Sequence, residues 1–122
     1  MSANNSKQVL GREGERIAEA YLKKKGYKLI ARNYRCAPGE IDLIVLDHRV
    51  LVFVEVKTRT GDAFGTPSEA VEFRKQQRMI RAAEHFLARK GLQQRDARFD
   101  VVGITLGREP VVEHIENAFD LS

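Results

Sequence analysis

Residues 39–57 read GEIDLIVLDHRVLVFVEVK, and this stretch decides the fold. Two runs rich in apolar and β-branched residues, 40–46 and 50–57, are separated by the polar group at 47–49, which is typical of a β-hairpin. A turn centred in that polar group pairs the apolar residues of one run with those of the other. Apolar residues on both faces of the second run predict a central strand, because such a strand is covered on both sides.

The same register has a chemical consequence, because it places Asp42 opposite Glu55. Directly opposed side chains lie about 5 Å apart, so two carboxylates there repel by roughly 3 kcal/mol at an effective dielectric of about 20. On a central strand we therefore expect a positive group between them. Lys57 projects from the same face as Glu55 and is one candidate, and a divalent cation is the other. The register also places Glu40 opposite Lys57.

The chemistry of these candidates favours Mg²⁺ over other metals. Mg²⁺ takes oxygen ligands, needs few protein carboxylates and keeps several waters that phosphate oxygens can replace. The histidines lack the spacing of zinc ligands, Cys36 is the only cysteine, and no Walker-type phosphate loop is present. The competing interpretation is a buried ion-pair cluster of Asp42, Glu55 and Lys57 without a metal. Both interpretations fit the residue pattern.

The segments around the hairpin predict a mixed α/β fold. Residues 66–69 combine an N-cap, a proline at the first helical position and a capping box, and Gly91 is placed to end the helix that starts there. A loop is expected at 58–65. The remaining elements are expected as helices at 11–25 and 66–90, and strands at 27–35, 99–106 and 111–115. Their order, αβββαββ, indicates one mixed sheet flanked by helices.

Polar side chains on the two predicted helices are candidates to complete the site. Gly14 lies near the centre of the apolar face of the first helix and permits close packing, while Glu15 lies at its edge, either reaching the site or solvated. Gln76 lies on the apolar stripe of the second helix, where it needs a partner in the site or in the core. A set of basic residues could surround a phosphate backbone or form a solvated face: Arg59, Arg74, Lys75, Arg78 and Arg81.

Length and composition limit the class of protein. The 122 residues, 43% hydrophobic and 31% charged, are expected to form a single domain over 1–122, with 1–10 as a flexible N-terminal arm. A net charge of +4 favours a polyanionic partner. No apolar run approaches the roughly 20 residues that span a membrane, and the polar start is unlike a signal peptide. We therefore expect a cytoplasmic protein without a membrane partner.

Several stretches together resemble the YraN-like family of uncharacterised bacterial proteins, from Gly11 onward. These stretches are Gly11–Ala18, Gly39–Ile44, Phe53–Arg59 and Arg98–Val102. That family in turn resembles the PD-(D/E)XK nuclease superfamily, especially archaeal Holliday-junction resolvases, whose restriction-endonuclease-like fold is a mixed sheet flanked by helices. Ile41 stands where that motif has its proline.

The resemblance implies a Mg²⁺-dependent endonuclease that hydrolyses phosphodiester bonds in DNA, with Mn²⁺ as an alternative metal. It makes Asp42 and Glu55 the metal ligands, together with the Val56 carbonyl, and Lys57 the catalytic lysine. Glu15 becomes the acidic residue of the first helix. A branched or structured DNA substrate and a homodimer follow from the likeness to resolvases. The alternative is a non-catalytic nucleic-acid-binding or scaffold domain that retains the nuclease fold.

Overall fold

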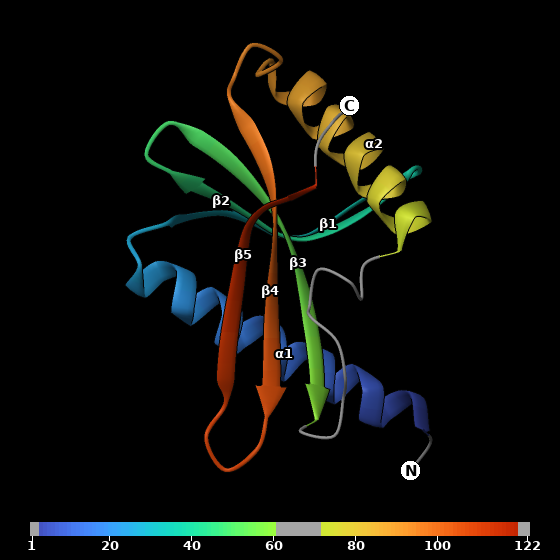
Figure 1. Cartoon of the computed structure of the whole chain (residues 1–122). Coiled ribbons are helices and arrows are strands. Elements are labelled where there is room, and N and C mark those ends of the chain that lie inside the picture. The colour runs from blue at the N-terminus through green and yellow to red at the C-terminus, as the bar shows by residue number, and fades with distance from the viewer. Residues whose placement is uncertain (1–2, 61–71, 120–122) are drawn as a thin grey trace.

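The computed structural model describes residues 3–60 and 72–119 of the chain. Five strands form one open, mixed sheet in the order β1-β2-β3-β4-β5, flanked by two helices (Figure 1). The elements are α1 (Ala3–Lys24), β1 (Lys28–Cys36), β2 (Gly39–Asp47), β3 (Val50–Thr60), α2 (Phe73–Lys90), β4 (Ala97–Leu106) and β5 (Val111–Phe119). This confirms the predicted mixed α/β fold and the order αβββαββ.

The strand β3 occupies the centre of the sheet, as its apolar sequence predicted. It pairs with β2 from Leu43 opposite Val54 to Asp47 opposite Val50, so the predicted register of the hairpin is confirmed. Its other neighbour, β4, runs parallel to it, whereas every other neighbouring pair in the sheet is antiparallel. A parallel pair needs a long crossover connection, and α2 lies within that connection.

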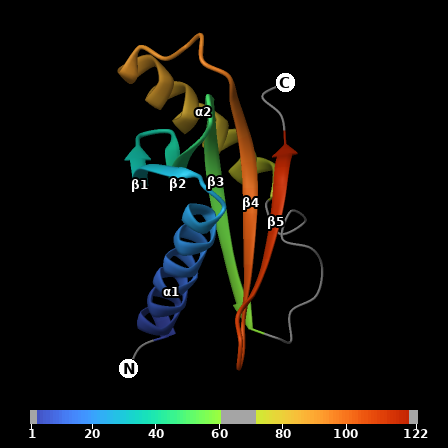
Figure 2. The ribbon, with the colours of Figure 1, turned by 90° about the vertical axis from the view of Figure 1, so that its left-hand side faces the viewer.

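The sheet separates two apolar clusters, one that includes residues of α2 and one that includes residues of α1. Figure 2 shows α1 alongside the lower part of the strands and α2 near their upper part. Consecutive residues of β3 point to opposite faces, so Phe53 packs with Phe86 of α2 while Val54 packs with Leu22 of α1. Each of these side chains is at most 3% exposed. Full burial of an apolar side chain of this size contributes about 1.5–3 kcal/mol, and the two clusters hold the helices against the sheet.

Close contact between α1 and β3 depends on Gly14. A Cβ atom added there would lie 1.7 Å from Thr58 Oγ1 and 2.8 Å from Thr58 Cβ, which leaves space for hydrogen alone. The expectation that Gly14 permits close packing is therefore confirmed. Because Glu15 follows in the same helix, this contact also sets the position of Glu15 relative to β3.

Several element bounds differ from the sequence prediction. The helix α1 begins at Ala3 rather than near residue 11, so the segment predicted as an N-terminal arm is helical from Ala3 onward. Backbone hydrogen bonds extend a helix past its apolar stripe, and the prediction relied on that stripe. The strand β3 continues to Thr60, opposite Leu106, because parallel pairing with β4 includes residues 58–60 of the segment predicted as a loop. Residues 61–65 of that segment lie outside the described part of the chain. No helix in residues 3–60 or 72–119 has the length and apolar character of a membrane span.

The second helix differs from its prediction at the start but not at the end. Glu72 has an extended backbone, with φ −64° and ψ 151°, so no continuous helix runs from Thr66 to Lys90. The predicted capping residues 66–69 lie outside the described residues. Gly91 ends α2 as predicted, with a left-handed φ of 67°.

Candidate functional site

Regular strand geometry breaks down in β2 at Asp42. Ile41 and Ile44 belong to the same apolar cluster, although residues three apart in an unbroken strand point to opposite faces. In β1, the residue Asn33 has a positive φ of 49°, and the register between β1 and β2 skips it and Asp42. The N–H of Val56 donates to Asp42 Oδ2 at 2.8 Å. This bond fixes the Asp42 carboxylate against β3.

The Asp42 carboxylate lies within hydrogen-bonding reach of Glu55, one residue beyond the last regular pair of the hairpin. Glu55 is almost fully buried, with 2% of its surface exposed. Burial, followed by the nearby negative charge of Asp42, raises the pKa of Glu55 to about 7. Adjacent carboxyl groups in a buried position need a cation nearby to remain ionised.

Two lysines approach Glu55, and the nearer one comes from α2. The Nζ atom of Lys75 lies 2.5 Å from Glu55 Oε1, whereas the Nζ of Lys57 lies 4.0 Å from the same oxygen. Sequence reasoning assigned Lys75 to a nucleic-acid surface and expected Lys57 beside the carboxylates. One signal could have revealed this position, because Lys75 precedes the buried Met79 by four residues and so shares its face of α2.

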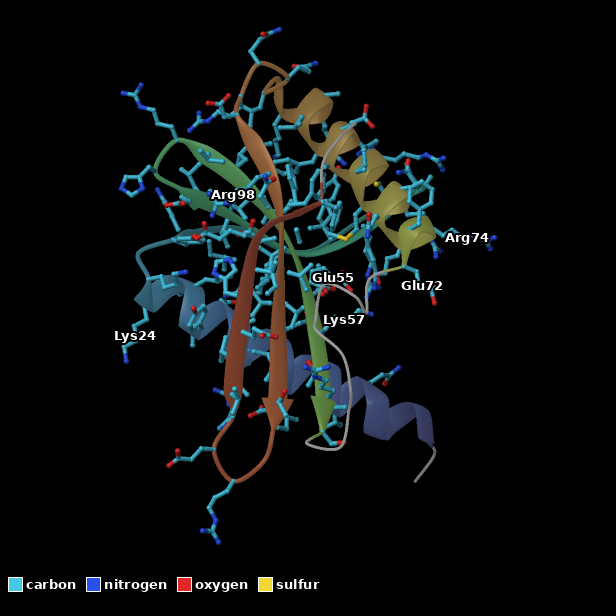
Figure 3. All side chains as sticks on the ribbon, viewed as in Figure 1. Lys24, Glu55, Lys57, Glu72, Arg74 and Arg98 are labelled. Atoms are coloured by element: carbon cyan, nitrogen blue, oxygen red, sulfur yellow. The ribbon has the colours of Figure 1, made fainter. Side chains whose placement is uncertain are left out.

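Glu15 lies in the same cleft as the hairpin carboxylates. This cleft has a volume of about 380 Å³, and Glu15, Asp42, Glu55 and both lysines line it, with the backbone around Val56. Burial and then the charge of Asp42 raise the pKa of Glu15 above its ordinary range. The structure thus brings together the four residues predicted as catalytic, from α1, β2 and β3, and adds one from α2. Figure 3 shows Glu55 and Lys57 on β3, beside the start of α2.

The predicted pairing of Glu40 with Lys57 is wrong. On the β1 side of β2, Glu40 stands opposite Arg35 and forms an ion pair with it, at 3.3 Å between Arg35 Nε and Glu40 Oε2. The described pairs of β2 with β3 end at Leu43 and Val54, before they reach Glu40. The predicted register is therefore confirmed only from Leu43 and Val54 to the turn, and it does not extend to Glu40 and Lys57.

The predicted basic residues differ in their surroundings. Arg78 lines a second cleft of about 380 Å³ with Arg35 of β1. Lys75 lines this second cleft and also the acidic cleft, which is the one that contains Glu15, Asp42 and Glu55. Arg74 is exposed and extends away from Glu55 (Figure 3). Arg81 is also exposed, whereas Arg59 and Gln76 are partly buried. The sequence analysis missed Arg35, which alternation in β1 alone does not distinguish from a solvated arginine.

The carboxylates of the acidic cleft suit a cation that prefers oxygen ligands and keeps several bound waters better than one that protein groups coordinate completely. Within the described parts of the chain, no group of three or more histidine, cysteine, aspartate and glutamate side chains is arranged to hold a metal ion. Asp42 and Glu55 nevertheless offer neighbouring oxygens, and the ammonium of Lys75 shows that this position accommodates a positive charge. Mg²⁺ requires few protein ligands because water completes its shell, so the donor set fits Mg²⁺.

The stretch Arg98–Val102 forms a separate buried network. Asp100 is fully buried and accepts hydrogen bonds from Arg98 Nε at 3.0 Å and from the backbone N–H of Asn117 at 3.0 Å, and its Oδ2 lies 2.7 Å from His114 Nε2. Burial opposes ionisation of Asp100, but these hydrogen bonds outweigh it and lower the pKa of the carboxyl group. Arg98 lies away from Glu55 on the sheet (Figure 3), so this network holds β4 against β5.

Comparisons with known proteins give sequence relatives of about 50% identity and a distant structural similarity. Residues 14–104 match the sequence model of the uncharacterised protein family UPF0102. A UPF0102 protein of Alkaliphilus metalliredigens is 52% identical over 110 residues, which cover 90% of this chain and 96% of that protein. One of Geobacter metallireducens is 46% identical over 123 residues, which cover 100% and 99%. Among solved structures, Pyrococcus furiosus SfsA in complex with Ca²⁺ aligns at a TM-score of 0.43 and 15% identity, covering 90% of this chain and 63% of that one.

Proposed function

The chain belongs to the uncharacterised protein family UPF0102, and we propose that it is a metal-dependent nuclease that hydrolyses phosphodiester bonds in DNA. One observation carries the proposal. Two carboxyl groups from neighbouring strands, Asp42 and the buried Glu55, meet in a cleft that Lys57 and Glu15 also line. Burial of several charged groups is energetically unfavourable, but together they form a site that can bind a cation and a phosphate.

Each of these residues has a role in the proposed reaction. Asp42, Glu55 and the carbonyl of Val56 would hold Mg²⁺ or Mn²⁺, which supplies a Lewis acid for a phosphate oxygen and an acidified water molecule. Lys57, with a partly exposed ammonium in the same cleft, orients the attacking water and stabilises the negative charge that develops on the phosphate. Glu15 supports the cation directly or through a water molecule.

Basic side chains around the cleft would hold the nucleic acid. Arg35 and Arg78 line the cleft beside the acidic one, and the chain carries a net charge of +4. Contacts of this kind bind the phosphate backbone without reading its sequence, so they position the substrate rather than select it. Arg59 and Arg74 remain candidates farther from the carboxylates. A branched DNA substrate and a homodimer remain predictions that follow from the likeness to resolvases.

A second candidate function is a non-catalytic nucleic-acid-binding domain. The ion pair between Lys75 and Glu55 favours it, because this lysine already provides the positive charge that the carboxylates need. In that case the acidic cleft would be a structural element, and the cleft lined by Arg35 and Arg78 would bind nucleic acid without a metal.

DNA cleavage by the purified protein separates the two candidates. We expect cleavage of linear, single-stranded or four-way DNA that depends on Mg²⁺ or Mn²⁺. Glu55→Gln should abolish it through loss of a metal ligand, and Lys57→Ala through loss of the group that orients the water. Removal of one transition-state contact commonly lowers the rate by about 10² to 10³.

Two exposed residues of α2 provide matched controls for these substitutions. Glu84→Gln makes the same chemical change as Glu55→Gln, and Lys90→Ala the same change as Lys57→Ala, outside the acidic cleft. Both controls should retain full cleavage. Cleavage that survives Glu55→Gln and Lys57→Ala would refute the proposed site. Wild-type protein that binds DNA but cuts no substrate with either metal would establish the non-catalytic alternative.

A further inference from the structure

Lys75 stands between the two neighbouring clefts. On one side it lines the acidic cleft and contacts Glu55, and on the other it lines the cleft that contains Arg35 and Arg78. The side chain of Lys75 is 35% exposed, whereas that of Glu55 is 3% exposed. The carboxylate is therefore held in place by its surroundings, while the long lysine side chain has open space on both sides.

The ammonium of Lys75 occupies the position where a cation would have to bind. Its Nζ atom lies 2.5 Å from Glu55 Oε1, and the charges of Asp42 and Glu40 also act on it. A divalent cation that binds the same carboxylate oxygens would repel this ammonium strongly at contact distance. The two cations cannot share Glu55, so binding of one must displace the other.

The second cleft offers the displaced lysine a suitable partner. Its walls include the guanidinium groups of Arg35 and Arg78, and its one acidic lining residue, Glu40, is already paired with Arg35. Three cationic side chains around one cleft form a site for a phosphate group, which accepts hydrogen bonds from all of them. Without an anion in this cleft, Glu55 is the carboxylate that Lys75 contacts, at 2.5 Å between Nζ and Oε1.

We propose that Lys75 has two working positions, on Glu55 in the metal-free protein and on a nucleic-acid phosphate in the Arg35–Arg78 cleft once a divalent cation is bound. This inference rests on the proposed nuclease function and adds a phosphate subsite to it. Because metal binding frees the lysine that the phosphate needs, each ligand raises the affinity for the other, as thermodynamic linkage requires.

Calorimetric titration with Mn²⁺ tests the competition directly. Lys75→Met removes the competing ammonium, so it should bind Mn²⁺ about tenfold more tightly than wild type, within the usual range of coupling between two ligands. Lys90→Met removes an exposed lysine from the same helix and should bind Mn²⁺ as wild type does. Lys75→Gln, which retains a hydrogen bond donor for Glu55, serves as a second variant if Lys75→Met does not fold.

Two further measurements follow the lysine and the phosphate. Brief acetylation of wild-type protein, read by mass spectrometry, should label Lys75 more strongly when Mn²⁺ is present and should leave Lys90 unchanged. Ca²⁺ should tighten the binding of a fluorescent DNA oligonucleotide to wild type more than to Lys75→Met.

The outcomes distinguish this inference from the proposed function. Equal or weaker Mn²⁺ binding by Lys75→Met, or labelling that does not respond to Mn²⁺, would overturn the two positions of Lys75 and leave the metal site intact. Absence of Mn²⁺ binding in wild type and in both Lys75 variants would overturn the proposed metal site as well.

Discussion

Replacing Gly14 by alanine should destabilise this protein, although alanine is the better helix former. The substitution adds one methyl group at the place where α1 meets β3. That carbon would lie 1.7 Å from Thr58 Oγ1 and 2.8 Å from Thr58 Cβ, far inside van der Waals contact. Rotation of the Thr58 side chain can move its hydroxyl but not its Cβ, so the helix must move away from the strand.

Two opposing contributions set the size of the effect. Alanine in place of glycine inside a helix stabilises by about 1 kcal/mol. Forcing a methyl group into occupied space costs about 1–3 kcal/mol, and the Thr58 Cβ, which no side-chain rotation can move away, favours the upper end of that range. We therefore expect a net loss of about 2 kcal/mol in the free energy of unfolding. For a domain of this length, that loss lowers the melting temperature by roughly 8 °C.

Denaturant unfolding followed by circular dichroism measures this loss, and Gly11→Ala is its matched control. Gly11 lies one turn earlier in α1, and among the described residues no atom outside the neighbouring helix backbone comes within 4 Å of an added Cβ there, so this variant should gain stability. Thr58→Ala removes Oγ1 and Cγ2, so the double variant should lose less than the sum of the single variants. Equal stability of Gly14→Ala and Gly11→Ala would refute the close contact.

Three further predictions concern stability. Asp100→Ala leaves Arg98 and His114 without their buried acceptor and should cost about 3–5 kcal/mol on chemical denaturation, so a loss below about 1 kcal/mol would contradict the network. The pKa of Asp100 is lowered, so its ionised carboxylate stabilises the folded protein above pH about 4, the ordinary pKa of aspartate, and this stabilisation is lost as the pH falls further. The stability of wild type should therefore fall more steeply with acid than that of Asp100→Asn. The pKa of Glu55 is raised to about 7, so ionisation of this group destabilises the fold at pH 8. Metal-free Glu55→Gln should therefore be at least as stable as wild type at that pH. A clear loss of stability would show that the ion pair between Glu55 and Lys75 outweighs the repulsion from Asp42.

The fold was largely predictable because its main signals are local. The hairpin register follows from a short turn between two apolar runs, and the central place of β3 follows from apolar residues on both of its faces. The close contact at Gly14 also follows from helical spacing. Each of these inferences uses residues that are near one another in the chain, where periodicity and sterics leave few alternatives.

The errors of the sequence analysis share one physical origin. Glu40 was placed opposite Lys57 on the assumption that the hairpin ladder continues to its open end, but the described pairs of β2 with β3 end at Leu43 and Val54, and Glu40 forms its ion pair with Arg35 of β1. A strand irregularity depends on contacts with several neighbouring elements, so no local residue pattern marks it. The predicted second helix also included Glu72, whose backbone is extended.

The sequence by itself determined the order of the elements, the register of the hairpin, and the proximity of Asp42 to Glu55. Residues close together in the chain determine these features, because they depend on periodicity and on pairing across one short turn. The tertiary structure alone decided that Lys75 contacts Glu55 more closely than Lys57 does. That contact depends on how far α2 slides and rotates over the sheet, and the packing of the whole apolar cluster beneath the helix sets both.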